Sequence, residues 1–142
     1  MSGAVSGLVG LPGDPFHILA ATMSGGLHRI DLRALPAGGA GLSNSAAAAH
    51  AGGIVLSYEG HCNSRSLLRP SIDARGHLLA ACGEDGRCRV WSLRAGGRPL
   101  AAEGGDGTAD NPGFSTAFGE GLLGFSSPVL LCGGRQGVRL AA

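Results

Sequence analysis

Short apolar runs separated by glycine-rich turns recur along the chain and predict an all-β fold. The runs have the length of strands, and several alternate apolar and polar residues as a half-buried strand does. Glycine between two runs suits a tight turn, because glycine tolerates a positive φ. The predicted strands are residues 5–11, 16–22, 27–32, 54–58, 66–72, 77–82, 87–93, 114–118, 128–132 and 138–141. We therefore expect antiparallel hairpins that follow one another along the chain.

Two stretches interrupt this pattern. Residues 34–53 consist largely of Ala, Gly and Ser, and residues 103–112 are polar and rich in glycine. Such compositions bury too little apolar surface to hold a fixed structure. We predict a low-complexity loop at 34–53 and a second irregular loop at 103–112.

The best-defined unit of the chain runs from residue 60 to residue 94. It opens with Gly60-His61, continues through two apolar runs, an acidic turn and an alternating strand, and ends just after the one tryptophan, Trp91. This order of features is typical of a WD repeat, the sequence unit of a β-propeller blade. A similar unit ends at Arg33, as this one ends at Arg94. A third and weaker copy begins near residue 114.

At roughly 40–45 residues per blade, the 142 residues of the chain correspond to about three blades. A closed ring needs about 4–8 blades. We therefore expect a partial β-propeller, which is an incomplete ring that self-association could also complete.

Composition argues against several classes of function. The net charge is +1 and the basic residues are spread out, so direct binding to nucleic acid is not expected. No run approaches the roughly 20 apolar residues of a membrane span. The N-terminus also lacks the charged and apolar regions of a signal peptide. We expect an intracellular protein of the nucleus or cytoplasm that does not contact a membrane.

Cysteine and histidine give no sign of a metal or cofactor. The cysteines lack the C-x-x-C spacing of a zinc or redox site, and the five histidines lack metal-ligand spacing. Reduced, structural thiols are the default expectation for an intracellular protein, although a disulfide stays open. The cysteines are Cys62, Cys82, Cys88 and Cys132.

His61, Asp85 and Trp91 occupy positions at which a WD blade can build a buried hydrogen-bond chain. In that arrangement Asp85 holds His61 in one tautomer, and Trp91 buries its ring with the indole N–H satisfied. The alternative is a His–Asp pair in a small enzyme, but no nucleophile motif accompanies it. We favour the structural role and expect no enzymatic activity.

The segments Tyr58-Glu59-Gly60-His61 and Val90-Trp91-Ser92-Leu93 resemble the last repeats of DCAF proteins, the WD-repeat substrate receptors of cullin-4 RING ubiquitin ligases. Residues 23–33 and parts of 117–136 are similar to neighbouring segments of that family. The resemblance implies that residues 1–142 are the C-terminal part of a WD-repeat β-propeller. It implies protein partners, among them the DDB-type adaptor of the cullin-4 ligase.

The resemblance further implies a docking motif, because such receptors bind the adaptor through a W-D-x-R box whose Arg makes the polar contacts. The chain has two imperfect boxes: Ile30-Asp31-Leu32-Arg33 lacks the Trp, and Trp91-Ser92-Leu93-Arg94 lacks the Asp. The implied adaptor-binding residues are Asp31, Arg33, Trp91 and Arg94. The alternative is a generic WD-repeat scaffold with no ligase link, in which both arginines are ordinary exposed strand ends.

Overall fold

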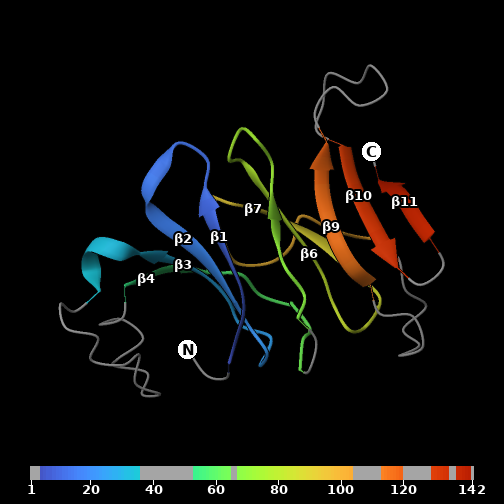
Figure 1. The fold of residues 1–142 in the computed structure, drawn as a ribbon, viewed down its shortest axis with the longest axis horizontal. Coiled ribbons are helices and arrows are strands. Elements are labelled where there is room, and N and C mark those ends of the chain that lie inside the picture. Colours follow the sequence, from blue (N-terminus) through green and yellow to red (C-terminus); the bar gives the residue numbers. More distant parts are fainter. Residues whose placement is uncertain are drawn as a thin grey trace.

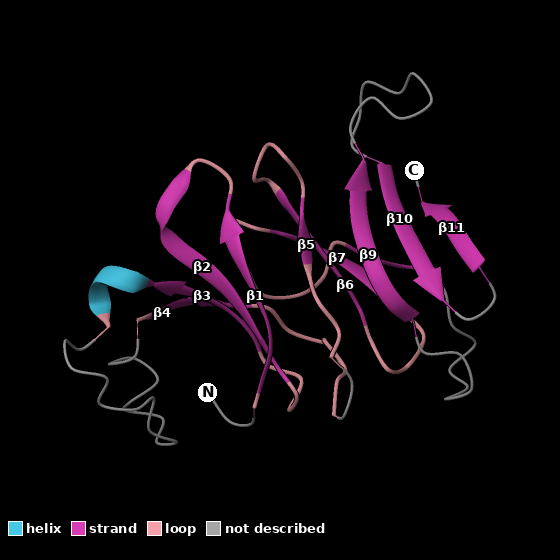
Figure 2. Ribbon diagram, viewed as in Figure 1, coloured by secondary structure: helices cyan, strands magenta, loops and turns pink. Residues whose placement is uncertain are grey.

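The computed structural model describes residues 4–35, 53–64, 67–103, 113–119, 129–134 and 137–141, the last three ranges through their backbone alone. Eleven strands and one short 3-10 helix lie within these residues. The strands form three antiparallel sheets that stand side by side in a fan (Figure 1). Figure 2 shows that strands dominate the described part of the chain, which confirms the all-β prediction.

The first sheet has the order β1-β2-β3-β4, with β1 at Val5–Leu11, β2 at Asp14–Thr22, β3 at Leu27–Asp31 and β4 at Ile54–Ser57. The second has the order β5-β6-β7-β8, with β5 at Ser71–Ile72, β6 at Leu78–Cys82, β7 at Cys88–Ser92 and β8 at Ala101–Glu103. The third has the order β11-β10-β9, with β9 at Gly113–Gly119, β10 at Val129–Gly134 and β11 at Gly137–Ala141. The 3-10 helix η1 spans Leu32–Ala34.

Three elements differ from the predicted strands. β5 is shorter than the predicted 66–72, because Pro70 has no N–H to donate to a ladder. β8 was not predicted, since all three of its residues are exposed and it is held by pairing with β7 rather than by apolar burial. η1 was also missed. Most of the predicted loops 34–53 and 103–112 lie outside the described residues.

The sheets are arranged around their first strands. β5 contacts both β1 and β9, so the first strands of the three sheets lie together along the inside of the fan. The third strands, β3 and β7, therefore occupy corresponding places in the first two sheets. This matters for function, because each predicted box lies at the end of one of these strands.

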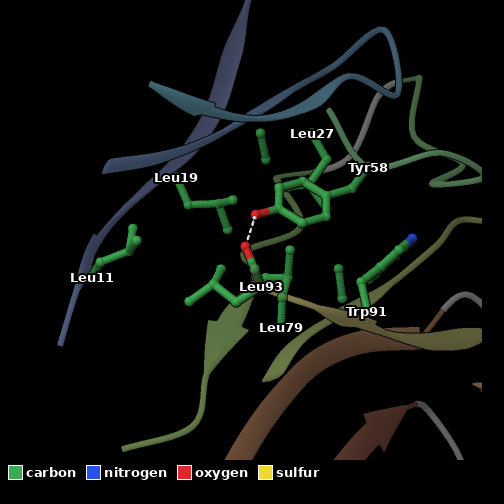
Figure 3. Packing of buried hydrophobic residues seen from close by; sticks show 9 residues of the cluster. Leu11, Leu19, Leu27, Tyr58, Leu79, Trp91 and Leu93 are labelled. Atoms are coloured by element: carbon green, nitrogen blue, oxygen red, sulfur yellow. Dashed lines mark hydrogen bonds between the residues drawn. The ribbon is translucent and has the colours of Figure 1, made fainter. Parts of the chain in front are cut away.

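The first two sheets share an apolar core, which contains Tyr58, Trp91 and leucines from both sheets (Figure 3). Trp91 is fully buried and is the largest such side chain in the described residues. Truncation of one buried Leu in such a core typically costs about 2–5 kcal/mol. The core residues are Leu11, Leu19, Ala21, Leu27, Tyr58, Leu79, Ala81, Trp91 and Leu93.

Two side chains tie the first sheet to the second through hydrogen bonds. The Tyr58 hydroxyl, just after β4, donates to the backbone oxygen of Leu93 at 2.7 Å (Figure 3). The Trp91 Nε1 donates to the backbone oxygen of Glu59 at 2.9 Å. Backbone bonds reinforce this contact, because Gly97 exchanges hydrogen bonds with Ser57 and Glu59. We call the Tyr58–Leu93 and Trp91–Glu59 pairs the seam.

The predicted hydrogen-bond chain through His61, Asp85 and Trp91 is wrong, because these side chains bind other groups rather than one another. His61 Nε2 donates to the backbone oxygen of Cys82 at 3.2 Å, and its ring meets Trp91 edge-on with centroids 6.5 Å apart. Asp85 instead binds Arg89, whose Nη1 donates to Oδ1 at 3.0 Å and whose Nη2 donates to Oδ2. Arg89 outcompetes His61 because it is four residues away across the same turn and carries a full charge.

Gly83 makes room for the Asp85–Arg89 ion pair. A Cβ at residue 83 would lie 3.1 Å from Arg89 Nη1 and closer still to Asp85 Oδ1. Burial acts to raise the pKa of Asp85, but hydrogen bonds from Arg89 and from the Arg87 amide outweigh it and lower that pKa. Burial also lowers the pKa of His61, which favours the neutral ring.

The expectation that all the cysteines are reduced is wrong for Cys82 and Cys88. Cys82 and Cys88 are opposite each other on β6 and β7, with Cα atoms 4.1 Å apart, and they form a disulfide. The hairpin turn brings them together, although their separation of six residues matches no thiol motif. Cys62 is exposed and free, and Cys132 lies among residues described through backbone alone.

Tyr58→Phe should destabilise the fold through the seam. The change removes the hydroxyl and leaves the Leu93 carbonyl without its donor, so the free energy of unfolding should fall by about 1–3 kcal/mol. Urea unfolding followed by Trp91 fluorescence measures this, since Trp91 is the one tryptophan. Glu59→Gln alters an exposed side chain beside it and is the control, expected within about 0.5 kcal/mol of the parent protein. Equal stability of Tyr58→Phe and the parent would contradict the role of the seam.

Stability should also fall at alkaline pH. Burial raises the pKa of Tyr58 to about 12 from its ordinary 10.0. The unfolded chain therefore loses the phenolic proton first, and stability declines as the pH rises from about 10 towards about 12. Because Tyr58 is the one tyrosine, phenolate absorbance reports its titration directly. Phenolate formation in the folded protein near pH 10 would count against burial of this hydroxyl.

Mild acid should destabilise the fold through His61, which is buried, and His28, which is half-buried. Burial lowers the pKa of His61 and of His28 from the ordinary 6.5. The unfolded chain therefore binds protons first, and stability falls as the pH drops below about 6.5. His61→Gln and His28→Gln should each flatten the stability profile between pH about 5 and 8. A His61→Gln profile with the parent slope would refute the contribution of His61.

Candidate functional site

The first predicted box lies where β3 ends and η1 begins. Asp31 caps η1, because its Oδ1 accepts a hydrogen bond from the Arg33 backbone N at 2.9 Å. The Arg33 side chain folds back onto the same carboxylate, with Nε 3.0 Å from Oδ1 and Nη2 2.8 Å from Oδ2. The Arg33 side chain is still 59% exposed. Asp31 therefore holds a guanidinium at the surface in a fixed orientation.

Phe16 supports this guanidinium from the neighbouring strand. The Arg33 Cζ atom lies 4.8 Å from the centroid of the Phe16 ring, which is a cation–π contact. Phe16 is 48% exposed, so about half of this residue stays open to solvent beside Arg33. The contact follows from the β2–β3 pairing, in which His17 faces Asp31. The residue before His17 thus comes beside the residues that follow Asp31.

A second layer of charged groups lies next to Asp31. Asp14 Oδ2 accepts hydrogen bonds from His17 Nδ1 at 2.8 Å and from Arg29 Nη2 at 3.2 Å. His17 Nε2 is in turn 3.8 Å from Asp31 Oδ2. Asp14, His17, Arg29 and Asp31 therefore form a continuous network along β2 and β3.

The network keeps its carboxylates ionised. Hydrogen bonds from the Arg33 side chain, followed by the one from its backbone N, lower the pKa of Asp31 to about 2. The hydrogen bond from His17 lowers the pKa of Asp14. The same pairing with Asp31 raises the pKa of Arg33. Asp31 and Arg33 are therefore both charged throughout the physiological pH range.

Sequence reasoning missed Phe16, Asp14, His17 and Arg29 as parts of this site. The pattern predicted the hairpin but did not fix its register, and register decides which residues of β2 lie beside Asp31. The turn at Ser24-Gly25-Gly26 was the available signal, since hairpin register follows from turn length.

The second predicted box is built differently. Trp91 is fully buried in the core, so it supports the fold and offers no contact surface. Ser92 stands in the Asp position, and its Oγ accepts from the Ala95 backbone N at 3.3 Å. Arg94 is exposed, and no ion pair holds it within the described residues. The structure thus presents Arg33 as a fixed cation and Arg94 as an unfixed one.

The remaining predicted residues support the fold. His61 lies between β4 and β5, packs edge-on against Trp91 and donates a hydrogen bond to the backbone oxygen of Cys82. Asp85 lies in the turn between β6 and β7 and binds Arg89. In the described part of the chain, no three His, Cys, Asp or Glu side chains gather as metal ligands would. No helix there has the length and apolar character needed to cross a membrane.

Comparison with known sequences identifies one relative of known family. No protein-family model matches the chain. DDB1- and CUL4-associated factor 4-like protein 2 of Homo sapiens is 34% identical over 83 residues, which are 58% of this chain and 21% of that protein. The chain therefore spans about a fifth of the length of this relative. The resemblance to a DCAF protein is confirmed over that segment.

Comparison with solved structures establishes the architecture. The WD40 β-propeller domain of Doa1 superposes with a TM-score of 0.65 and 19% sequence identity, over 99% of this chain and 37% of that chain. At this identity the likeness shows the fold and carries no function. The chain has the fold of part of a WD40 β-propeller, and its three sheets are the blades of an incomplete ring.

Proposed function

We propose that this chain is a non-enzymatic interaction module that docks on the DDB1 adaptor of a cullin-4 ubiquitin ligase, as part of a substrate receptor. The observation that carries the proposal is the first box, in which Asp31 and Phe16 fix Arg33 at the surface. The name of the human relative, which describes association with DDB1 and CUL4, supports it.

The geometry of Arg33 suits a docking residue. Arginine and aromatic side chains supply most of the strongest contacts in protein interfaces. An arginine that is already ordered loses less conformational freedom on binding, which favours affinity. Asp31 and Phe16 provide that order here from two directions. The proposal places the protein in the nucleus or cytoplasm and assigns it no catalytic step, cofactor or metal.

The proposal is tested by recovery of purified DDB1 on the immobilised full chain. The double variant Arg33→Ala, Arg94→Ala should reduce recovery by about tenfold or more, because truncation of an arginine at an interface hot spot costs about 2 kcal/mol or more and about 1.4 kcal/mol is tenfold in affinity. Arg98→Ala is the matched control, since its side chain is 92% exposed and lies outside both boxes. Arg98→Ala should leave recovery unchanged.

Two results would contradict the proposal in different ways. Undiminished recovery by the double variant would show that DDB1 docks elsewhere on the chain. Failure of the parent chain to recover DDB1 at all would favour a generic WD-repeat scaffold without a ligase link. Circular dichroism of each variant confirms that the β-sheet content is retained.

A further inference from the structure

The surface around Arg33 carries more than the box itself. Phe16, Leu32 and Leu35 are 48%, 38% and 37% exposed, and η1 packs against β2, so these apolar side chains come from adjoining elements. We call Phe16, Leu32, Leu35 and Arg33 the docking pad. Aromatic and arginine side chains are enriched in protein interfaces, and Phe16 and Arg33 bring one of each into contact at this surface.

The charges near the pad cancel. Asp14 and Asp31 carry two negative charges, Arg29 and Arg33 carry two positive charges, and all four groups lie in one network with His17. The two carboxylates and the two guanidinium groups together carry no net charge. A partner carboxylate approaching Arg33 therefore meets the Asp31 carboxylate as well, and long-range attraction is small.

Arg33 nevertheless has hydrogen-bonding capacity to spare. A guanidinium has five N–H donors, and Asp31 takes one from Nε and one from Nη2. The remaining donors point away from Asp31 in the fixed plane of the guanidinium. A neutral acceptor such as a backbone carbonyl can use them without repulsion from Asp31.

Resting on the proposed function, we propose that the docking pad is the contact surface and that it receives a neutral, apolar part of DDB1. An apolar side chain of DDB1 packs on Phe16 and Leu32, while a backbone or amide oxygen beside it accepts hydrogen bonds from Arg33. Phe16 is a contact residue, and Asp31 is a positioning residue that acts through Arg33. Among the described residues, neither a carboxylate nor an aromatic ring fixes Arg94, and in this proposal Arg94 contributes little.

The affinity of the full chain for purified DDB1, measured at about 0.1 M and about 0.5 M NaCl, tests this proposal. Screening weakens contacts between unlike charges over this range, so a neutral contact should change by less than about threefold. Phe16→Ala should weaken binding by about tenfold or more at both salt concentrations. Arg94→Ala should change it by less than about threefold. Leu67→Ala, at a residue that is 71% exposed outside the pad, is the matched control.

Asp31→Asn distinguishes a neutral partner from an acidic one. The substitution loosens Arg33 and leaves the network with one net positive charge. If DDB1 offers a neutral acceptor, Asp31→Asn weakens binding at low salt, because the fixed orientation of Arg33 is lost. If DDB1 offers a carboxylate, Asp31→Asn strengthens binding at low salt, and that result overturns the proposal. Thermal unfolding followed by Trp91 fluorescence checks that each variant is folded.

Other outcomes separate this inference from the function on which it rests. Binding that survives Phe16→Ala but is lost in Arg94→Ala overturns the docking pad and leaves the adaptor role standing. A strong loss of parent affinity with added salt also overturns the neutral contact alone. A parent chain that does not bind DDB1 overturns both.

Discussion

The seam between the first two sheets is the contact on which the rest of the structure depends. A propeller blade has apolar faces that it cannot bury alone, and neighbouring blades must supply the cover. Here Trp91 and Tyr58 fill the space between the sheets, and their polar ends satisfy the backbone oxygens of Glu59 and Leu93. Burial of the apolar Trp91 and Tyr58 rings supplies the attraction, while the two hydrogen bonds fix the alignment of the segments that contain Glu59 and Leu93. Without that fixed alignment, β3 and β7 would not end at corresponding places.

The sequence was informative where structure depends on local pattern. Alternation and glycine turns were sufficient to predict the hairpins of all three sheets, because side-chain period and turn chemistry are local properties. Features that depend on contacts outside the strand pattern were not predicted. β8 exists because β7 offers it a ladder, and Asp73 is buried at 1% exposure because its Oδ1 accepts from the amides of His77 and Leu78. The segment around Asp73 signals a turn, but nothing in it signals burial.

The candidate site was predicted in part for the same reason. The boxes could be read from residue order, so Asp31 and Arg33 were found. Phe16 could not be found, because its place beside Arg33 depends on the register of β2 against β3. The His61–Asp85 connection failed because Arg89, a residue with no part in the motif, lies nearer to Asp85 and binds it with two nitrogens.

The two boxes show the physical role of each motif position. The aspartate, present in the first box, orients the arginine through its carboxylate. The tryptophan, present in the second box, is fully buried in the core. Ile30, which replaces Trp in the first box, is buried at 3% exposure, so the fold is kept there with a smaller side chain. Ser92, which replaces Asp in the second, keeps a turn hydrogen bond but has no charge to hold Arg94.

Loss of one motif residue therefore has different consequences for the orientation of the arginine in the two blades. The first blade can lose its tryptophan without losing an oriented arginine, because Phe16 and Asp31 hold Arg33 from outside the core. The second blade keeps its tryptophan and its core but loses orientation at the surface. Stability and docking are thus carried by different side chains, and Arg33 also covers one face of a half-exposed aromatic ring. That cover reduces the apolar surface shown to water before a partner binds, and the ring can contribute to an interface at little cost to the unbound protein.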